Sequence, residues 1–132
     1  MYMDYKKTIR EGFALFSQKN GFKQEDVARF FHPAYQQYVD GHHLDYKGFI
    51  AHMIAQRKVV QEMEIFFKTI VQEGNIVFTN HEVFIKKIDG QPIKIQVIAE
   101  FLFEEDKVIK CEELTYLMEG SNEDRDIGSR IH

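Results

Sequence analysis

The chain is poor in cysteine, tryptophan and proline: its 132 residues include one cysteine, no tryptophan and two prolines. A single cysteine excludes an internal disulfide and any zinc site built from several cysteines. The 17 basic residues are scattered and the net charge is −4. Because phosphate recognition needs a concentrated positive surface, we expect no nucleic-acid partner.

Long apolar segments are also missing. No stretch approaches the roughly 20 apolar residues that span a bilayer, and residues 1–7 lack the apolar region of a secretion signal. We therefore expect a cytoplasmic protein with no membrane partner. Hydrophobic residues make up 44% of the chain, enough for one compact domain over residues 1–132. Residues 119–132 are polar and rich in glycine, and we interpret them as an ordered extension or a frayed end.

Apolar residues recur at helical spacing in the first part of the chain. Ile9, Phe13 and Phe16 predict a first helix, and Gly21 follows where a helix C-terminus favours a left-handed residue. A second short helix is predicted over residues 24–30.

A strand and a third helix follow. Residues 34–39 predict a strand after Pro33, and Asp40-Gly41 ends it. Asp45 is a candidate N-cap for the third helix. Its predicted core-facing stripe is Tyr46, Phe49, Ile50, Met53, Ile54 and Arg57.

The period changes to two from residue 59 onward. Residues 62–71 predict a long strand, residues 73–75 its turn, and three more strands follow. Helices first and a mostly antiparallel sheet afterwards indicate an α+β fold rather than a doubly wound one.

The Asp-Gly pair at 89–90 predicts a two-residue type I′ hairpin turn. Such a turn places His81 opposite Ile98 and Thr79 opposite Glu100, and paired residues point to the same face. A second turn at 105–106 extends the sheet in the same way. One face then carries a polar set of Thr79, His81, Gln96, Glu100, Cys111, Glu113 and Thr115. The other face carries Phe78, Phe84, Ile93, Ile95, Val97, Ala99, Phe101, Phe103, Leu114, Tyr116 and Met118.

Both predicted faces of the sheet are rich in apolar residues. A sheet with one face in water shows clean alternation of apolar and polar residues, and these strands do not. The helices of the chain can cover one face. We therefore predict that a second copy covers the aromatic-rich face, giving a homodimer.

Three stretches resemble the nuclear transport factor 2-like superfamily, in particular its SnoaL-like branch. They are FHPAYQQYVDG at 31–41, DYKGFIAH at 45–52 and CEELTYLMEG at 111–120. The similarity runs from about residue 31 to residue 130, and the N-terminal helix matches only in kind. The resemblance implies a curved, mostly antiparallel sheet wrapped around helices, a cone-shaped cavity and frequent dimerisation through the outer face.

The resemblance implies several possible activities. The superfamily includes ketosteroid isomerases, polyketide cyclases, dehydratases and members without chemistry, so the fold alone does not assign a function. Isomerase and cyclase members use a cavity aspartate for proton transfer. This chain has no aspartate that matches, because Asp40 ends a strand and Asp89 lies in a turn.

Acid–base chemistry would therefore fall to His81, Glu113 or Glu100. A neutral imidazole titrates near pH 6.5 and a neighbouring carboxylate would raise its pKa, so we expect His81 as the base and a glutamate as the acid. The three groups would titrate as a unit. Such a cluster suits enolisation or aldol-type reactions. The alternative is a core histidine whose hydrogen bonds are satisfied by Glu113 or Glu100.

Other polar residues are candidates for ligand contacts. The predicted ligand-binding set is Tyr35, Gln37, His52, Gln96, Thr115 and Cys111. Tyr35 and Gln37 lie on the same face of the predicted strand. The alternative interpretation is the ordinary alternation of an edge strand. His52 lies beside the apolar stripe of the third helix. We expect its side chain to point to the cavity mouth, to lie at the surface, or to form a hydrogen bond with Tyr35 or Gln37. We interpret Cys111 as a small buried residue rather than a nucleophile.

No spacing in the sequence demands a metal ion or a cofactor, and we predict neither. His42 and His43 are interpreted as solvated loop residues. A facial site of two histidines and a carboxylate could be assembled from His52, His81 and Glu113, but nothing requires it.

We predict a protein that binds a small apolar organic ligand, with its function otherwise undefined. Its leading enzymatic version is a cofactor-independent isomerase, cyclase or dehydratase for a carbonyl compound. The alternative is a non-catalytic binding or dimerisation module with a vestigial pocket. Cavity volume distinguishes the two, because ligand pockets hold roughly 300–1,000 Å³ and a scaffold would be filled.

Overall fold

The computed structural model describes residues 3–18 and 22–121, which form helices packed on one sheet. The helices are α1 (Tyr5–Phe16), α2 (Gln24–Phe30) and α3 (Tyr46–Val59). The strands are β1 (Phe31–Val39), β2 (His42–Asp45), β3 (Val60–Glu73), β4 (Ile76–Lys87), β5 (Pro92–Glu104) and β6 (Lys107–Glu119). Gly21 and most of the predicted C-terminal extension, residues 122–132, lie outside the described residues.

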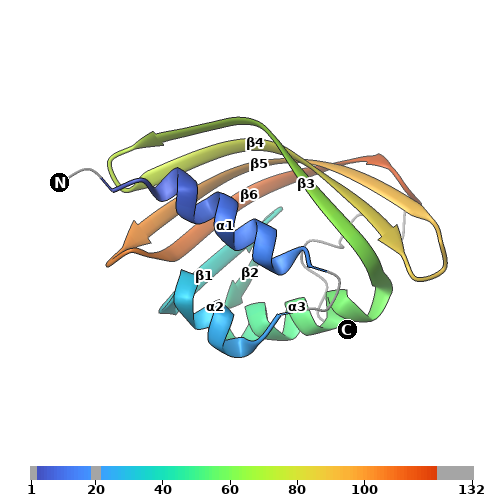
Figure 1. Cartoon of the computed structure of the whole chain (residues 1–132), viewed down its shortest axis with the longest axis horizontal. Coiled ribbons are helices and arrows are strands. Elements are labelled where there is room, and N and C mark those ends of the chain that lie inside the picture. Colours follow the sequence, from blue (N-terminus) through green and yellow to red (C-terminus); the bar gives the residue numbers. More distant parts are fainter. Residues whose placement is uncertain (1–2, 19–21, 122–132) are drawn as a thin grey trace.

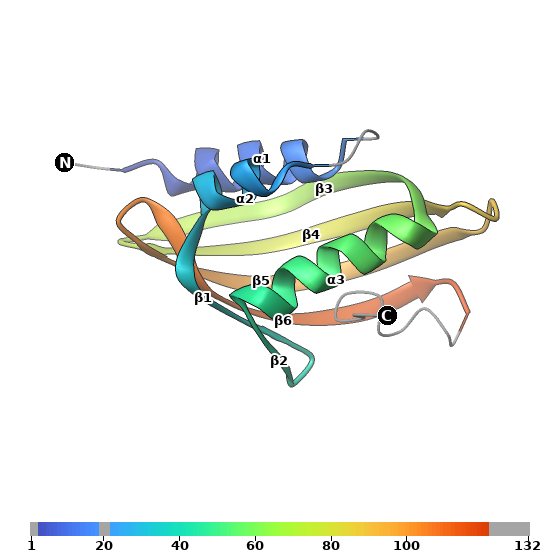
Figure 2. The same cartoon turned by 90° about the horizontal axis from the view of Figure 1, so that it is seen from below.

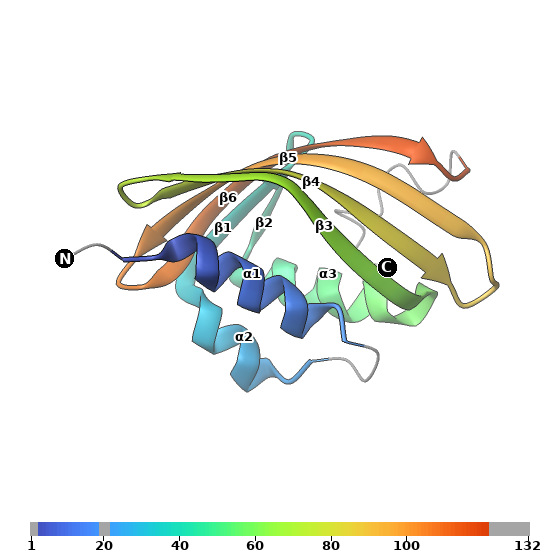
Figure 3. The same ribbon diagram turned by 45° about the horizontal axis from the view of Figure 1, so that its top comes forward.

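The six strands form one sheet in the order β2-β1-β6-β5-β4-β3. Among the strand pairs of the described residues, β1–β6 alone is parallel. The sheet bends like an arch, and the three helices lie on its concave side (Figures 1 and 3). Figure 2 shows α1 and α3 running across that side at a distance from each other. The predicted α+β fold with a curved, mostly antiparallel sheet is confirmed.

Local signals define most element boundaries. Asp4 accepts a hydrogen bond from the Lys7 amide at 3.2 Å and Asp45 accepts one from the Gly48 amide at 2.8 Å, so both carboxylates cap helices as N-cap residues do. The second helix has the predicted bounds, and β3 extends beyond the predicted strand at both ends.

The structure differs from the prediction around the first strand. β1 begins at Phe31, three residues earlier than predicted, and contains Pro33. Proline is tolerated there because the pairing of β1 with β6 is interrupted between Phe31 and Gln36. Residues 42–45 form the short strand β2 on the other edge of β1, so the prediction of a loop at His42 and His43 is wrong.

The predicted turn at 89–90 has the right position and the wrong length. The Lys87 amide donates to the Gln91 carbonyl at 2.9 Å, and the Gly90 amide donates to the Lys87 carbonyl at 2.8 Å. With Gly90 at φ +89°, the loop comprises three residues, Ile88 to Gly90, as in a type I turn followed by a left-handed residue. The added residue shifts the pairing of β5 by one.

This shift moves every side chain of β5 to the opposite face. His81 pairs with Val97 rather than Ile98, and Thr79 pairs with Ala99 rather than Glu100. Gln96 and Glu100 therefore lie on the convex face, and their prediction as inward residues is wrong. The inward side chains are those predicted to face outward: Ile93, Ile95, Val97, Ala99, Phe101 and Phe103.

The second predicted turn, at residues 105–106, is confirmed, and a shift in strand register follows it. Glu105 and Asp106 have φ of 51° and 69°, and Glu104 pairs with Lys107 as predicted. The register then shifts between Leu102 and Phe103, so Glu100 pairs with Glu112 instead of Cys111. A bulge of this kind adds one residue and restores the predicted inward face of β6.

The buried face of α3 also differs from the predicted stripe. Phe49 and Met53 are buried as expected, but Ile54 is 47% exposed and His52 is 6% exposed. Rotation of the buried face by part of a turn brings His52 towards the sheet.

The convex face of the sheet exposes a row of apolar side chains. They are Tyr38, Phe66, Val71, Phe78, Phe84, Ile98, Leu114, Tyr116 and Met118. No element within residues 3–18 and 22–121 lies over this face (Figures 1 and 3). None of the described helices has the length and apolar content needed to cross a membrane.

Candidate functional site

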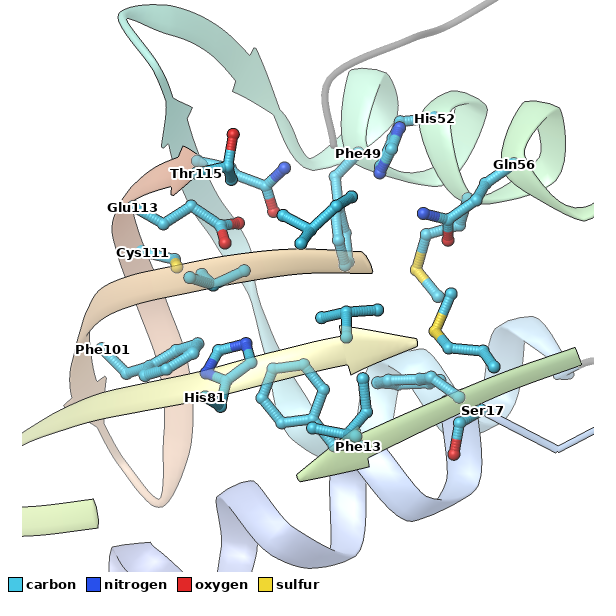
Figure 4. Close-up of a pocket in the computed structure, with 18 of the residues that line it drawn as sticks. Phe13, Ser17, Phe49, His52, Gln56, His81, Phe101, Cys111, Glu113 and Thr115 are labelled. Atoms are coloured by element: carbon cyan, nitrogen blue, oxygen red, sulfur yellow. The ribbon is translucent and has the colours of Figure 1, made fainter. Parts of the chain in front are cut away.

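A cavity of about 160 Å³ lies between the concave face of the sheet and helices α1 and α3 (Figure 4). Seven of the nine predicted site residues line it: Tyr35, Gln37, His52, His81, Cys111, Glu113 and Thr115. Gln96 and Glu100 do not, because the register of β5 turns them to the convex face. There Gln96 donates its side-chain amide to Asn80 Oδ1 at 3.1 Å.

Aromatic rings form the wall beside α1. The Phe13 ring centroid lies 5.2 Å from His81, 5.5 Å from Phe67 and 6.0 Å from Phe101. These separations fit the edge-to-face and tilted contacts that aromatic rings prefer. Phe13 was predicted only as a core residue, and its helical spacing from Ile9 gave no sign that it borders a site.

A second aromatic cluster forms the opposite wall. Phe31 lies 4.7 Å from both Tyr35 and Phe49, and Tyr35 lies 4.9 Å from Phe49. The cavity therefore lies between two groups of rings that come from different elements. Gln56 and Met63, which also line it, carried no functional signal in the sequence.

His81 is a neutral imidazole in this environment. It is 2% exposed, and its Nδ1 is hydrogen-bonded to Thr79 Oγ1 at 2.9 Å. Burial lowers the pKa of His81 to about 4, because the charged form loses its water. The prediction that a carboxylate raises the pKa of His81 is wrong. Glu100 lies on the other face, and Phe13 and Phe67 exclude water from the ring.

Glu113 has the opposite pKa shift. Its carboxyl group points into the cavity from β6 (Figure 4). Burial and, to a smaller extent, the negative charge of Asp40 together raise the pKa of Glu113 to about 7. The group is therefore close to half ionised at neutral pH.

Asp40, directly after β1, lies beside Glu113. Its amide donates to the Glu113 carbonyl at 3.0 Å. Its carboxylate accepts hydrogen bonds from the Thr115 amide at 2.8 Å and from the Thr115 hydroxyl. Sequence reasoning placed Asp40 only at a strand end, because the parallel pairing of β1 with β6 was not predicted.

Tyr35 and Cys111 stay protonated. The Tyr35 hydroxyl donates to Gln37 Oε1 at 2.8 Å. Burial, followed by the nearby Cys111 and Glu113, raises the pKa of Tyr35 well above its usual value. Burial, followed by Glu113, likewise raises the pKa of the Cys111 thiol. A thiol of raised pKa is a poor nucleophile, so Cys111 is best described as part of the cavity wall.

A metal site is not formed by the residues that the structure describes. Within residues 3–18 and 22–121, no three side chains of histidine, cysteine, aspartate or glutamate are close enough together to hold an ion. His52 comes from α3, on the far side of the cavity from His81 (Figure 4). The facial arrangement considered from the sequence is therefore not assembled.

The geometry suits proton transfer to or from a bound molecule. No polar side-chain atom in the described part of the chain is buried without a hydrogen-bond partner. Thr79 occupies Nδ1 of His81, which leaves Nε2 as the imidazole nitrogen available to the cavity. A carboxyl group with a pKa near 7 and a neutral imidazole thus face one apolar space.

No family model matches the chain. An uncharacterised protein of Schizosaccharomyces pombe is 34% identical over 129 residues, and the match covers 98% of each chain.

Solved structures share the fold at lower identity. AclR of Streptomyces galilaeus, a proposed hydroxylase, has a TM-score of 0.72 and 15% identity, over 84% of this chain and 74% of AclR. A proposed SnoaL-like polyketide cyclase of Jannaschia sp. CCS1 has a TM-score of 0.65 and 12% identity, over 83% and 85% of the two chains. An NTF2-like protein of unknown function from Burkholderia pseudomallei has a TM-score of 0.65 and 15% identity, over 85% and 90%.

Proposed function

Because the chain belongs to one family with the S. pombe protein and has the nuclear transport factor 2-like fold of the SnoaL-like type, we propose that it binds a small apolar carbonyl compound and transfers a proton on it without a cofactor. One observation carries the proposal: Glu113, with a pKa of about 7, shares an apolar cavity with neutral His81. A general acid or base is most effective when its pKa lies near the working pH.

The proposed step begins with the Glu113 carboxylate. It takes the proton from the carbon next to the carbonyl group, and the electrons of that C–H bond move to the carbonyl oxygen to give an enolate. In the proposed tautomer His81 Nε2–H donates a hydrogen bond to this oxygen, and Nδ1 accepts one from the Thr79 hydroxyl, with which it is in contact at 2.9 Å. Glu113 then returns the proton to the same carbon or to a conjugated one.

These roles differ from those expected from the sequence. A histidine with a pKa of about 4 is too weak a base to act at neutral pH, whereas it can donate from a neutral ring. Glu113 is therefore the proposed base and acid in turn, and Glu100 has no part in the site. The name of the Jannaschia protein agrees with chemistry on a carbonyl compound, although fold likeness alone is an analogy.

Exchange of hydrogen for deuterium in a simple ketone tests the proposal. The protein is incubated with cyclohexanone in D₂O at pH 7, and loss of the proton signals next to the carbonyl is followed by NMR. We expect exchange above the buffer rate, lowered about 100-fold or more in Glu113→Gln, since general acid–base catalysis contributes factors of this size. His81→Gln should also lower the rate, because the enolate loses its donor.

Glu112→Gln is the matched control. Glu112 is the neighbouring residue on the convex face, where its carboxylate lies 2.6 Å from Lys110 Nζ. This variant should retain the full exchange rate. If the wild type binds the ketone but exchanges no proton faster than buffer does, the non-catalytic binding module is the better description.

A further inference from the structure

We propose that the cavity is matched to an uncharged ligand no larger than about one substituted six-membered ring, an inference that rests on the proposed function. The cavity encloses about 160 Å³. An engineered protein cavity of about 150 Å³ takes up benzene, and pockets for drug-sized ligands hold roughly 300–1,000 Å³. Compounds with several fused rings therefore exceed the available space.

The aromatic walls resist expansion of the cavity. Phe13 contacts three other rings on its side, at 5.2 to 6.0 Å between centroids. On the opposite side Phe49 contacts Phe31 and Tyr35 at 4.7 and 4.9 Å. Moving one ring would break several contacts at once, and close-packed interiors respond to such changes with strain.

The polarity of the lining favours an uncharged ligand. Three of its polar groups already have partners, since Tyr35 bonds to Gln37, Thr115 to Asp40, and His81 Nδ1 to Thr79. No lysine or arginine among the described residues lines the cavity, so an anion would find no opposite charge there. Burial of an unpaired charge is costly. Glu113 and Nε2 of His81 are the groups proposed to receive one carbonyl oxygen and its neighbouring carbon.

A ligand can approach from the side of α1 and β3. A surface hollow between these elements shares Phe13, Ser17 and Met63 with the cavity. Ser17 and Gln56 lie at the end of the cavity away from Glu113 (Figure 4). The carbonyl end of the ligand would therefore point inwards, and its ring would lie between Phe13 and Phe49.

Binding of ketones of graded size tests the inference. Isothermal titration calorimetry at pH 7 would compare acetophenone, 2-acetonaphthalene and a tetracyclic steroid enone, with benzoate as the charged single-ring probe. We expect acetophenone to bind at least tenfold more tightly than 2-acetonaphthalene and benzoate, with no saturable binding of the steroid. Equal or tighter binding of any of the other three would overturn the inference.

Enlarging the cavity tests whether its walls set the limit. Met53 is 7% exposed and lines the cavity, whereas Met118 is 44% exposed on the convex face. Met53→Ala should raise the affinity for 2-acetonaphthalene relative to acetophenone by tenfold or more, and Met118→Ala should leave the ratio unchanged. Phe13→Leu provides a second enlargement should the first variant fail to fold. An unchanged ratio in folded Met53→Ala and Phe13→Leu would contradict the inference.

Different results would contradict the size limit and the proposed chemistry. If acetophenone binds selectively but Glu113→Gln leaves exchange of its methyl protons unchanged, the size limit stands and the proposed chemistry is wrong. If a multi-ring ketone binds best and Glu113 is needed for its exchange, the chemistry stands and the size limit is wrong.

Discussion

Asp40 is the residue that tunes the acid strength of Glu113 from outside the cavity. It lies at the end of β1 with φ of 50°, where its carboxylate accepts from Thr115 and its amide donates to the Glu113 carbonyl. Its negative charge disfavours ionisation of Glu113 and adds to the larger effect of burial. Other titratable groups that line the same space are Tyr35, His52, His81 and Cys111.

Replacing Asp40 by asparagine should lower the pKa of Glu113. Asparagine tolerates positive φ and retains an oxygen for the Thr115 amide, so the turn is preserved. We expect the pKa to fall below about 7 but to stay above the usual 4.5, because burial remains. NMR titration of the side-chain carboxyl carbon measures this, and the pH profile of exchange should move to lower pH by the same amount. Asp89→Asn, at the β4–β5 turn, is the control, and an unchanged Glu113 titration in Asp40→Asn would contradict the tuning role.

His81 and Glu113 have opposite effects on stability as pH changes. The pKa of His81 falls from 6.5 to about 4 on folding, so stability is lost as pH drops through this range. The pKa of Glu113 rises from 4.5 to about 7, so stability is lost as pH increases through that range. Between pH 4.5 and 6.5 the two contributions oppose each other.

Single substitutions should therefore reveal how the stability contribution of each group changes with pH. The free energy of unfolding of Glu113→Gln should rise with pH from 4.5 to 6.5, by up to about 1.4 kcal/mol per pH unit, because only the His81 contribution remains. His81→Gln should show the opposite slope, because only the Glu113 contribution remains. Urea denaturation at three pH values compares each variant with the wild type. Parallel curves for all three proteins would show that these groups do not control stability.

At the scale of elements, the three-residue turn between β4 and β5 decides which face of β5 is inside. Gly90 occupies the left-handed position of this turn at φ +89°, where a side chain is strained. Gly12 in α1 is different, because a Cβ there would meet the Phe30 ring at ordinary contact distances of 3.5 to 3.8 Å.

Substitution of the two glycines by alanine should change the stability of the protein in opposite directions. Gly90→Ala should destabilise the protein by about 1–2 kcal/mol, the cost of a left-handed residue with a side chain. Gly12→Ala should stabilise it by about 0.5–1 kcal/mol through helix propensity. Thermal and urea unfolding of both variants measure these changes. A loss of stability in Gly12→Ala as large as that in Gly90→Ala would show that backbone conformation is not the deciding factor.

At the scale of the whole molecule, the convex face of the sheet remains without a covering in the described structure, and a homodimer stays a prediction. Its ion pairs are internal to the face: Lys94 lies 3.6 Å from Glu82, and Lys110 lies beside Glu112. These pairs neutralise part of the charge of the face, on which Glu100 also lies. Apolar side chains with paired charges between them suit contact with an identical surface.

Sedimentation velocity tests this prediction. Leu114 is 68% exposed on the convex face, and a glutamate there would bury an unpaired charge in a dimer. We expect a dimer for the wild type and a monomer for Leu114→Glu. Ile88→Glu is the control, because Ile88 is 62% exposed at the tip of the β4–β5 turn. A wild type that sediments as a monomer at micromolar concentration would contradict the prediction.

The helices and the inward sides of β4 and β6 were predictable because neighbouring residues encode them. The largest error in the fold lay in β5, where the Asp-Gly pair fits both a two-residue and a three-residue turn. Within residues 93–103, Lys94, Gln96 and Glu100 alternate with apolar residues, and this pattern points to the observed register. The alternation of the strand was a better guide than the turn.

The sequence by itself determined the helices, five of the six described strands, the α+β class and most of the polar residues that line the cavity, since these follow from periodicity along a short stretch of chain. Only the tertiary structure decided the protonation of His81 and Glu113. Their pKa values depend on water excluded by segments far apart in the chain, with Phe13, Phe67 and Phe101 enclosing the His81 side of the cavity and Asp40 lying beside Glu113. Burial is the sum of such distant contacts, and no local pattern records it.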